Sequence, residues 1–461
     1  MANCVLNFAM LGEDFFSPIE TQPLKEAFLI HKNQALYNKL GLDWDKQTLL
    51  KIASGEQTFQ STQPIASIYA GHQFGYFVPQ LGDGRSCLIG QVQGEELSLK
   101  GAGQTPYSRG ADGRAVLRSS IREYLCSIAM RGLNIATTEA LALVGSESEV
   151  YRESIETGAI VMRTAPSHIR FGHFELFASR GQKVEVKKLA DFVIEHYYPH
   201  CQGEQKYVDF FNEVVKRTAK MIANWQAQGF AHGVMNTDNM SILGLTIDYG
   251  PFGFLETYNP KFICNHSDHE GRYAFDQQPS IGLWNLSRLA DSLGSLMDAK
   301  QVKAILSNYQ IYLVETYSKL MRKKFGFSQK DEQDNALIGQ FFEVLYKNQK
   351  DYTNSLRQLS NIEQLAKDGV FDAWLILYDQ RIAQEDGSNR ALLMDSVNPK
   401  FILRNYLAEV SIRQAQDEKN YSEIDILFTL LSSPFSEHKD FESYTQEAPD
   451  WAQNLEVSCS S

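Results

Sequence analysis

Hydrophobic patterns in the first part of the chain predict strands and one long helix. Two short runs rich in apolar residues, Cys87–Val92 and Glu96–Lys100, flank a Gln-Gly-Glu turn and are predicted to form a β-hairpin. Apolar residues within 116–128 recur at spacings of three and four, which predicts an amphipathic helix. Glu123 lies on the flank of its apolar stripe, and Gly132 is placed to end the helix.

Helical periodicity dominates the rest of the chain. A short hairpin is expected within Ser154–Arg163, and the clearest later helix runs from about Tyr207 to Gln228. Two brief strands, Met240–Leu243 and Leu245–Asp248, are expected next, separated by a glycine. Helices prevail again beyond Leu283.

A strand-rich half with one important helix, followed by a helix-rich half, is the outline of an α+β fold resembling the two lobes of protein kinases. We expect residues 1–165 to form an N-terminal extension and a strand-rich N-lobe, and residues 166–435 to form a helical C-lobe. Residues 436–461 are polar and are expected to be an extended C-terminal tail. The chain of 461 residues is long enough to bury a large core.

Composition narrows the choice of partners and compartment. Hydrophobic residues make up 43% and charged residues 22%, as in globular proteins, and the net charge of −12 argues against a nucleic-acid partner. The chain lacks a run of about 18 apolar residues, so no membrane partner is expected. The start of the chain fits neither a secretory signal nor a mitochondrial presequence, and we expect a cytoplasmic protein.

Acidic and amide side chains follow the long helix in a pattern that suggests metal-dependent chemistry. Asp238 and Asn239 lie within His232–Met240, and Asp248-Tyr249-Gly250 begins ten residues after Asp238. Kinases place a catalytic Asp and a metal-binding Asn on one loop, followed by Asp-Phe-Gly with a second metal ligand. The pattern makes Asp238 the base and Asn239 and Asp248 ligands of Mg²⁺ or Mn²⁺, which prefer oxygen donors. An Asx-rich turn before a hairpin is the alternative.

Candidate phosphate ligands lie upstream of this loop. Lys100 ends a predicted strand and Glu123 lies on the next helix, the arrangement by which kinases aim an ammonium group at a phosphate. At ~4 Å such a pair gains roughly 4 kcal/mol before desolvation. Arg163 and Arg170 could grip phosphate as forked donors. Taken singly, Lys100 and Glu123 are more often a surface lysine and an ordinary helix glutamate, and each arginine is more often part of a surface ion pair.

Two glycine-rich stretches, Leu81–Arg85 and Gly101–Arg114, would let backbone N–H groups approach an anion closely. Gly-Asp-Gly is common in ordinary turns, and that alternative remains open for each stretch.

Taken together and in this order, the motifs resemble the selenoprotein O family of protein adenylyltransferases. The matching stretches are Tyr69–Gly75, Gln80–Arg85, Leu99–Arg109, His232–Met240 and Asp248–Phe254. The resemblance implies a kinase-like (pseudokinase) fold that binds ATP in an inverted orientation, with the α-phosphate facing the acceptor. It implies transfer of AMP to Ser, Thr or Tyr hydroxyls of proteins, redox-related proteins among the candidates, with release of pyrophosphate. UMP transfer is left open.

The resemblance also assigns roles by position. Asp238 would accept the proton, Asn239 and Asp248 would bind Mg²⁺ or Mn²⁺, and Glu123 would position Lys100. The residues implied to contact the ATP co-substrate are Gly82, Gly84, Arg85, Lys100, Asp112, Gly113, Arg163, Arg170 and, through the metal, Asp248.

The family resemblance extends to two of the six cysteines. Cys459 occupies the place near the C-terminus where eukaryotic members carry selenocysteine, and Cys264 follows Asp248. The resemblance implies a regulatory Cys264–Cys459 disulfide, against the alternative of two unpaired thiols.

Two other functions fit the same residues. The first is an ordinary phosphotransferase, and the second is a non-catalytic nucleotide-binding scaffold, against which the presence of Asp238, Asn239 and Asp248 speaks.

Overall fold

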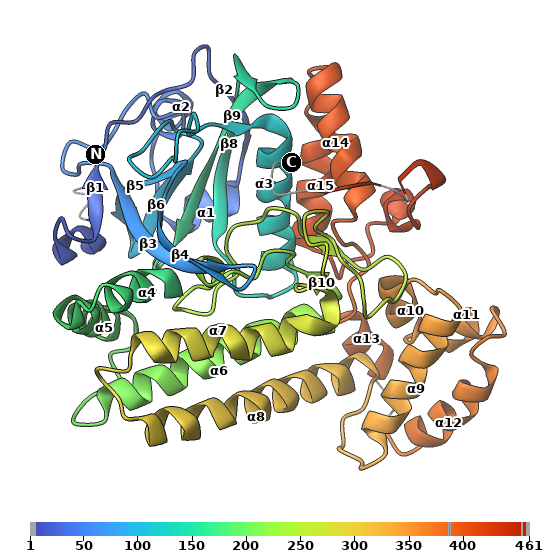
Figure 1. Cartoon of the computed structure of the whole chain (residues 1–461). Helices are drawn as coiled ribbons and strands as arrows, with labels where there is room; N and C mark the ends of the chain where they lie inside the picture. The colour runs from blue at the N-terminus through green and yellow to red at the C-terminus, as the bar shows by residue number, and fades with distance from the viewer. Residues whose placement is uncertain (1–5, 386, 388, 453–454, 458–461) are drawn as a thin grey trace.

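The structure, a computed structural model, describes residues 6–385, 387, 389–452 and 455–457. Within these residues an antiparallel sheet of nine strands occupies the N-terminal part, in the order β1-β3-β5-β6-β9-β8-β2, with β4 paired to β3 and β7 to β9 (Figure 1). Its strands are β1 (Phe16–Pro18), β2 (Phe28–Lys32), β3 (Ile65–Gln73), β4 (Tyr76–Gly82), β5 (Ser86–Val92), β6 (Glu95–Lys100), β7 (Ala115–Val116), β8 (Glu139–Tyr151) and β9 (Ile155–Ala165).

Of the two hairpins predicted for the sheet, the one at 87–100 is confirmed. β5 and β6 pair through the turn at Gln93 and Gly94, whose φ angles of 52° and 82° fit the two-residue turn that joins twisted strands. The hairpin expected within Ser154–Arg163 is wrong, because these residues form the single strand β9, and its partner β8 lies wholly upstream of that range. Two short helices, α1 (Gln34–Lys39) and α2 (Lys46–Ala53), lie between β2 and β3.

The long helix predicted in the first half is α3 (Leu117–Gly132), and it is buried on nearly all sides. One face packs on β8 and β9, and α14 and α15 cover the other, as Figure 1 shows. Gly132 ends the helix as predicted, but for a different reason. A Cβ at this position would lie 2.0 Å from the Leu431 carbonyl oxygen, so the glycine allows α15 to approach closely.

Helices form most of the C-terminal part, and α6, α7 and α8 stack beneath the sheet in Figure 1. The helix predicted at 207–228 is confirmed as α6. The helices are α4 (Phe171–Ser179), α5 (Lys183–Tyr197), α6 (Lys206–Ala227), α7 (Gln278–Ser292), α8 (Ala299–Lys324), α9 (Asp334–Lys347), α10 (Tyr352–Gln358), α11 (Ile362–Ala366), α12 (Asp372–Ile382), α13 (Arg390–Asp395), α14 (Asn405–Asp417) and α15 (Ser422–Ser432).

The predicted strands Met240–Leu243 and Leu245–Asp248 are wrong. These residues do not pair with each other: Ser241 forms a single bridge with Arg170, and Thr246 forms one with Thr137. The pairing occurs farther out, between β10 (Phe230–Ala231) and β11 (Gly253–Phe254), which close the loop that carries Asp238, Asn239 and Asp248. The loop is therefore anchored to several elements instead of folding as its own hairpin.

The end of the chain also differs from the prediction of an extended tail, because Lys439–Thr445 and Asp450–Ala452 form short 3₁₀ helices.

No helix within the described residues is long and apolar enough to cross a membrane. The largest hydrophobic cluster joins residues of both parts, from Ile65 and Ile121 to Phe210 and Leu407. The structure is thus a mixed α and β fold with an antiparallel sheet, whereas the kinase-like architecture and the divisions at 165 and 435 stay predictions.

Candidate active site

A cavity of about 700 Å³ lies between the sheet and the loop closed by β10 and β11. Most of the residues predicted to form the site line it: Gly82, Gly84, Arg85, Lys100, Asp112, Gly113, Arg170, Asp238, Asn239 and Asp248. Lysine and arginine side chains in the lining outnumber aspartates, although the whole chain is acidic. The cavity therefore suits an anionic ligand better than the rest of the molecule does.

Glu123 and Arg163 lie directly behind this lining and hold Lys100 from β6. Glu123 on α3 accepts hydrogen bonds from the Lys100 ammonium and from Arg163 Nη1, the latter at 2.9 Å. Both cations are almost fully buried, with 7% and 4% of their side chains exposed. The predicted pairing of Lys100 with Glu123 is present, and the shielded carboxylate restricts the conformations of both cations.

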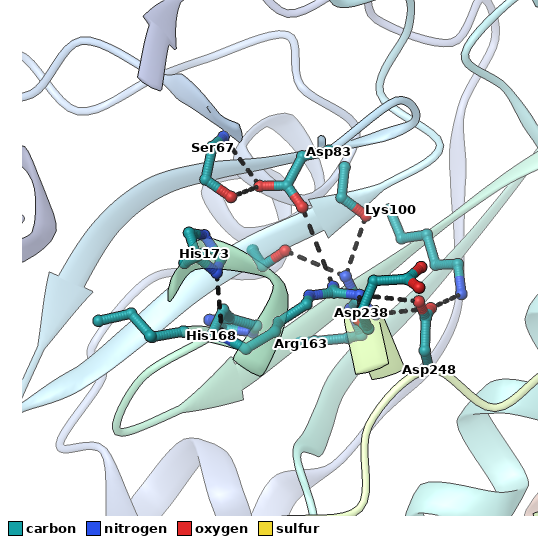
Figure 2. Close-up of polar contacts among 12 residues, drawn as sticks. Ser67, Asp83, Lys100, Arg163, His168, His173, Asp238 and Asp248 are labelled. Carbon is teal, nitrogen blue, oxygen red and sulfur yellow. Dashed lines mark hydrogen bonds and ion pairs between the residues drawn. The ribbon is translucent and has the colours of Figure 1, made fainter. Parts of the chain in front are cut away.

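Asp248 is surrounded by positive charge, as Figure 2 shows. Its carboxylate accepts hydrogen bonds from Lys100 Nζ at 2.8 Å and Arg170 Nη1 at 3.1 Å, and Arg163 Nη1 lies 3.8 Å away. Burial alone would raise the pKa of this carboxyl, but the charges of Lys100, Arg170 and Arg163 outweigh burial and hold the pKa well below its usual range. Asp248 is thus firmly anionic.

The backbone at Asp248 is in the left-handed region, with a φ of 63°. Such a conformation costs a residue other than glycine roughly 1 kcal/mol or more and persists where its surroundings enforce it. The two hydrogen bonds to the Asp248 carboxylate are the contacts that hold it here.

Asp238 lies in the same cavity but in a different environment. Gln73 Nε2 donates to its Oδ2 at 3.1 Å, whereas Arg170 donates to its backbone carbonyl and not to its carboxylate. Oδ1 is buried and has no hydrogen-bond partner among the residues that the structure describes. Burial raises the pKa of Asp238 to about 6, although the Gln73 hydrogen bond and the Arg170 charge lower it. A carboxylate with an unsatisfied buried oxygen is suited to take up a proton.

The predicted metal ligands fit a hard divalent cation. Asn239 Nδ2 donates to the Val234 carbonyl at 3.1 Å, which fixes the side-chain amide, and Asn239 and Asp248 both line the cavity. Asn and Asp oxygens are donors that Mg²⁺ and Mn²⁺ accept. Among the described residues no three His, Cys, Asp or Glu side chains form a metal centre. An ion here would therefore be held by Asn239 and Asp248 together with oxygens of the bound anionic ligand.

The glycine turns form one wall of the cavity. Gly113 has a φ of 66°, and a Cβ there would lie 2.1 Å from the Gly103 carbonyl oxygen, so only glycine fits. The carboxylate of Asp112 is engaged by Arg152 through two hydrogen bonds of 2.8 and 2.9 Å. Arg85 is exposed in the lining of the cavity.

Sequence reasoning missed the residues that hold the Asp238 loop in place. The Thr237 hydroxyl donates to Glu175 on α4 and accepts from the backbone N–H of His72 at 2.7 Å. His72 Nδ1 also binds Glu175, at 2.6 Å. His72 and Gln73 lie within the stretch Tyr69–Gly75 that carried the family resemblance, so that motif was the available signal for β3. Glu175 had no such signal.

Of the two predicted redox cysteines, only Cys264 lies within the described residues. Cys264 is buried, and its Sγ lies 3.5 Å from the Ala231 carbonyl oxygen. Cys459 lies outside the described residues. The backbone N–H of His266 donates to the Val457 carbonyl at 2.9 Å, so the described end of the chain reaches the segment that contains Cys264.

Comparisons with known proteins agree with a site of this kind. A model of the family described as protein adenylyltransferase SelO matches residues 2–432. The chain is 49% identical over 478 residues to the protein nucleotidyltransferase YdiU of Vibrio cholerae, covering 98% of each protein. It is 49% identical to the YdiU of Aliivibrio salmonicida, covering 97% of this chain and 96% of the relative, and 47% identical to that of Thiobacillus denitrificans, covering 98% of each.

The cation-lined cavity and these similarities define the class of the protein, an enzyme that transfers a nucleotidyl group. The chain belongs to the SelO family of protein adenylyltransferases, whose relatives carry the name YdiU.

Proposed function

We propose that the protein transfers AMP from ATP to Ser, Thr or Tyr hydroxyls of other proteins and releases pyrophosphate. The proposal rests on one observation: cations and a carboxylate that pairs with no described cation lie in the same cavity. Lys100 and Arg170 line the cavity around Asp248, with Arg163 behind them, and Asp238 lines the same cavity with a carboxylate that no cation pairs within the described residues. ATP is held in the orientation opposite to that in kinases, with its terminal phosphates toward the cations and its α-phosphate toward the acceptor.

The chemical step follows from this placement. The acceptor hydroxyl gives its proton to the Asp238 carboxylate, its oxygen forms a bond to the α-phosphorus, and the bond from that phosphorus to the β-bridging oxygen breaks. Lys100 and Arg170 stabilise the negative charge on the departing pyrophosphate, and Arg163 adds its charge from behind the cavity lining. Asn239 and Asp248 would hold Mg²⁺ or Mn²⁺, which would supply further charge neutralisation.

A labelling experiment tests this proposal directly. The protein is incubated with Mg²⁺ and an acceptor protein, and with ATP carrying a radioactive phosphorus at either the α or the γ position. Transfer of AMP predicts labelled protein only from the α position, together with released pyrophosphate. Label from the γ position alone would show a phosphotransferase, and absence of label in both cases would leave a nucleotide-binding scaffold.

A disulfide between Cys264 and Cys459 is part of the proposal. It is supported by the contact of His266 with Val457, two residues before Cys459. Oxidation should lower the activity of the unaltered protein and leave that of Cys459→Ser unchanged. Equal responses of both proteins to oxidant would contradict the pairing.

A further inference from the structure

A second cavity, of about 660 Å³, adjoins the first, and Phe74 lines both. It lies between the tip of the β3–β4 hairpin and the segment Lys261–Gln277 that follows β11. The Phe74 N–H donates to Asn236 Oδ1 at 3.1 Å and to the Tyr273 hydroxyl at 3.0 Å. Asn236 is two residues before Asp238, so the wall between the two cavities is bonded to the loop that carries the base.

The tip of this hairpin is held in a strained conformation. Gln73 pairs with Tyr76, and the two turn residues, Phe74 and Gly75, have φ angles of 50° and 89°. Turns of this kind favour Asn or Gly at the first position, so a phenylalanine there must be held by its contacts. The two hydrogen bonds of its N–H and the packing of its ring on Tyr273, with centroids 5.1 Å apart, supply them.

Arg272 contributes a positive charge to the lining of the second cavity. Its guanidinium lies over the Trp284 ring at 4.7 Å, and its Nε is buried without a hydrogen-bond partner. Within the described part of the chain it forms no ion pair. The other cation of the lining, Lys261, is paired with Asp276 at 2.7 Å, and Glu270 is exposed at the rim. Arg272 is therefore an oriented, partly shielded cation that lacks a counter-ion.

We propose that this second cavity docks the acceptor protein, and that Arg272 binds an acidic side chain close to the hydroxyl that receives AMP. The inference rests on the proposed function, which requires a protein segment to reach Asp238. Occupation of the second cavity would bring such a segment past Phe74 to the base. Tyr76, which is 81% exposed in the same lining, offers an aromatic surface for the segment.

Charge reversal provides the test. The full chain and its Arg272→Glu and Arg272→Gln variants are assayed with ATP labelled at the α position and synthetic peptides that each contain one hydroxyl residue. The residues flanking the hydroxyl are acidic in one peptide set, basic in the second and alanine in the third. The unaltered chain should favour acidic over basic flanks by about tenfold or more in kcat/KM. Arg272→Gln should lose this preference, and Arg272→Glu should reverse it.

A gain of activity toward basic peptides cannot arise from misfolding, which makes the reversal informative. Arg413→Gln is the matched control, because Arg413 also stacks on a tryptophan, Trp451, at 4.8 Å but lies outside both cavities. The KM for ATP should stay unchanged in all variants. Transfer of AMP to peptides of all three sets alike, or to intact proteins but to none of the peptides, would overturn the docking site while sparing the proposed function. Absence of any AMP transfer would overturn both.

Discussion

Asp238 and Asp248 are the same residue type, ten positions apart on one loop and lining one cavity, yet their surroundings differ in charge. Three cations surround the Asp248 carboxylate, whereas Asp238 receives one neutral hydrogen bond through its side chain, from Gln73. Arg170 Nη1 lies between them, bonded to the carboxylate of Asp248 but only to the backbone of Asp238. The pKa of Asp248 is accordingly held well below its usual range, and that of Asp238 is raised to about 6.

Charge placement, not residue type, separates the two roles. A permanently ionised carboxylate keeps three cations in place and can hold a metal ion. A carboxylate that titrates near neutral pH can take a proton and release it again. Neutralisation of either aspartate should therefore lower activity, but the two changes should alter the stability of the protein in opposite directions.

The largest effect is expected for Asp248→Asn. The change removes the anion that Lys100 and Arg170 bind, so transfer activity should fall by about 10⁴-fold or more. Breaking a buried charge cluster by removal of one partner costs about 3–5 kcal/mol of stability, so Tm should fall as well. Activity assays and thermal melting measure both, with Asp291→Asn, an exposed residue outside this cavity, as control. Full activity of Asp248→Asn would remove Asp248 from the site.

Asp238→Asn should separate activity from stability. Loss of the base should lower the rate by roughly 10²–10⁴-fold while nucleotide still binds. Because the folded-state pKa of about 6 lies above the ordinary value of 3.8, folding is penalised at pH 7 by the need to ionise a buried group. The variant should therefore have a higher Tm than the unaltered protein at pH 7, the opposite of Asp248→Asn. A lower Tm in both variants would contradict the contrast.

The pH dependence of the rate should show the same carboxyl. Asp238 must be ionised to accept a proton, so kcat/KM should fall about tenfold per pH unit below pH 6 and level off above it. Asp238→Asn should lack this acidic limb. A rate that is flat from pH 5 to 8 in the unaltered protein would show that Asp238 is not the base.

Most local elements, the chemical groups and the pairing of Lys100 with Glu123 could be predicted from the sequence, but the contacts that hold the Asp238 loop could not. Periodicity located α3 and α6, and the spacing of Asp238 from Asp248 predicted that the two would meet at one site, although with a hairpin between them that is absent. The strands expected at 240–248 were wrong, because Ser241 and Thr246 bridge to distant residues, and local propensity carries no information on such partners. Glu175 and Gln73 went unnoticed as supports of the loop for the same reason, since each meets it from a distant part of the chain.

The smallest effect is expected for a change at Gln73, which alters the surroundings of Asp238 and leaves those of Asp248 intact. Its Nε2 is the side-chain donor to the Asp238 carboxylate, and that hydrogen bond lowers the pKa of Asp238. Gln73→Leu removes the donor and should move the acidic limb of the pH profile upward, with a few-fold loss of rate at pH 7 and little loss above pH 8. Gln80→Leu on the neighbouring strand β4 is the matched control, because the Gln80 side chain accepts from Arg180 at 3.1 Å and is exposed. A uniform loss at all pH values would instead mean that Gln73 only shapes the cavity, and the electrostatic account of Asp238 would then depend on burial alone.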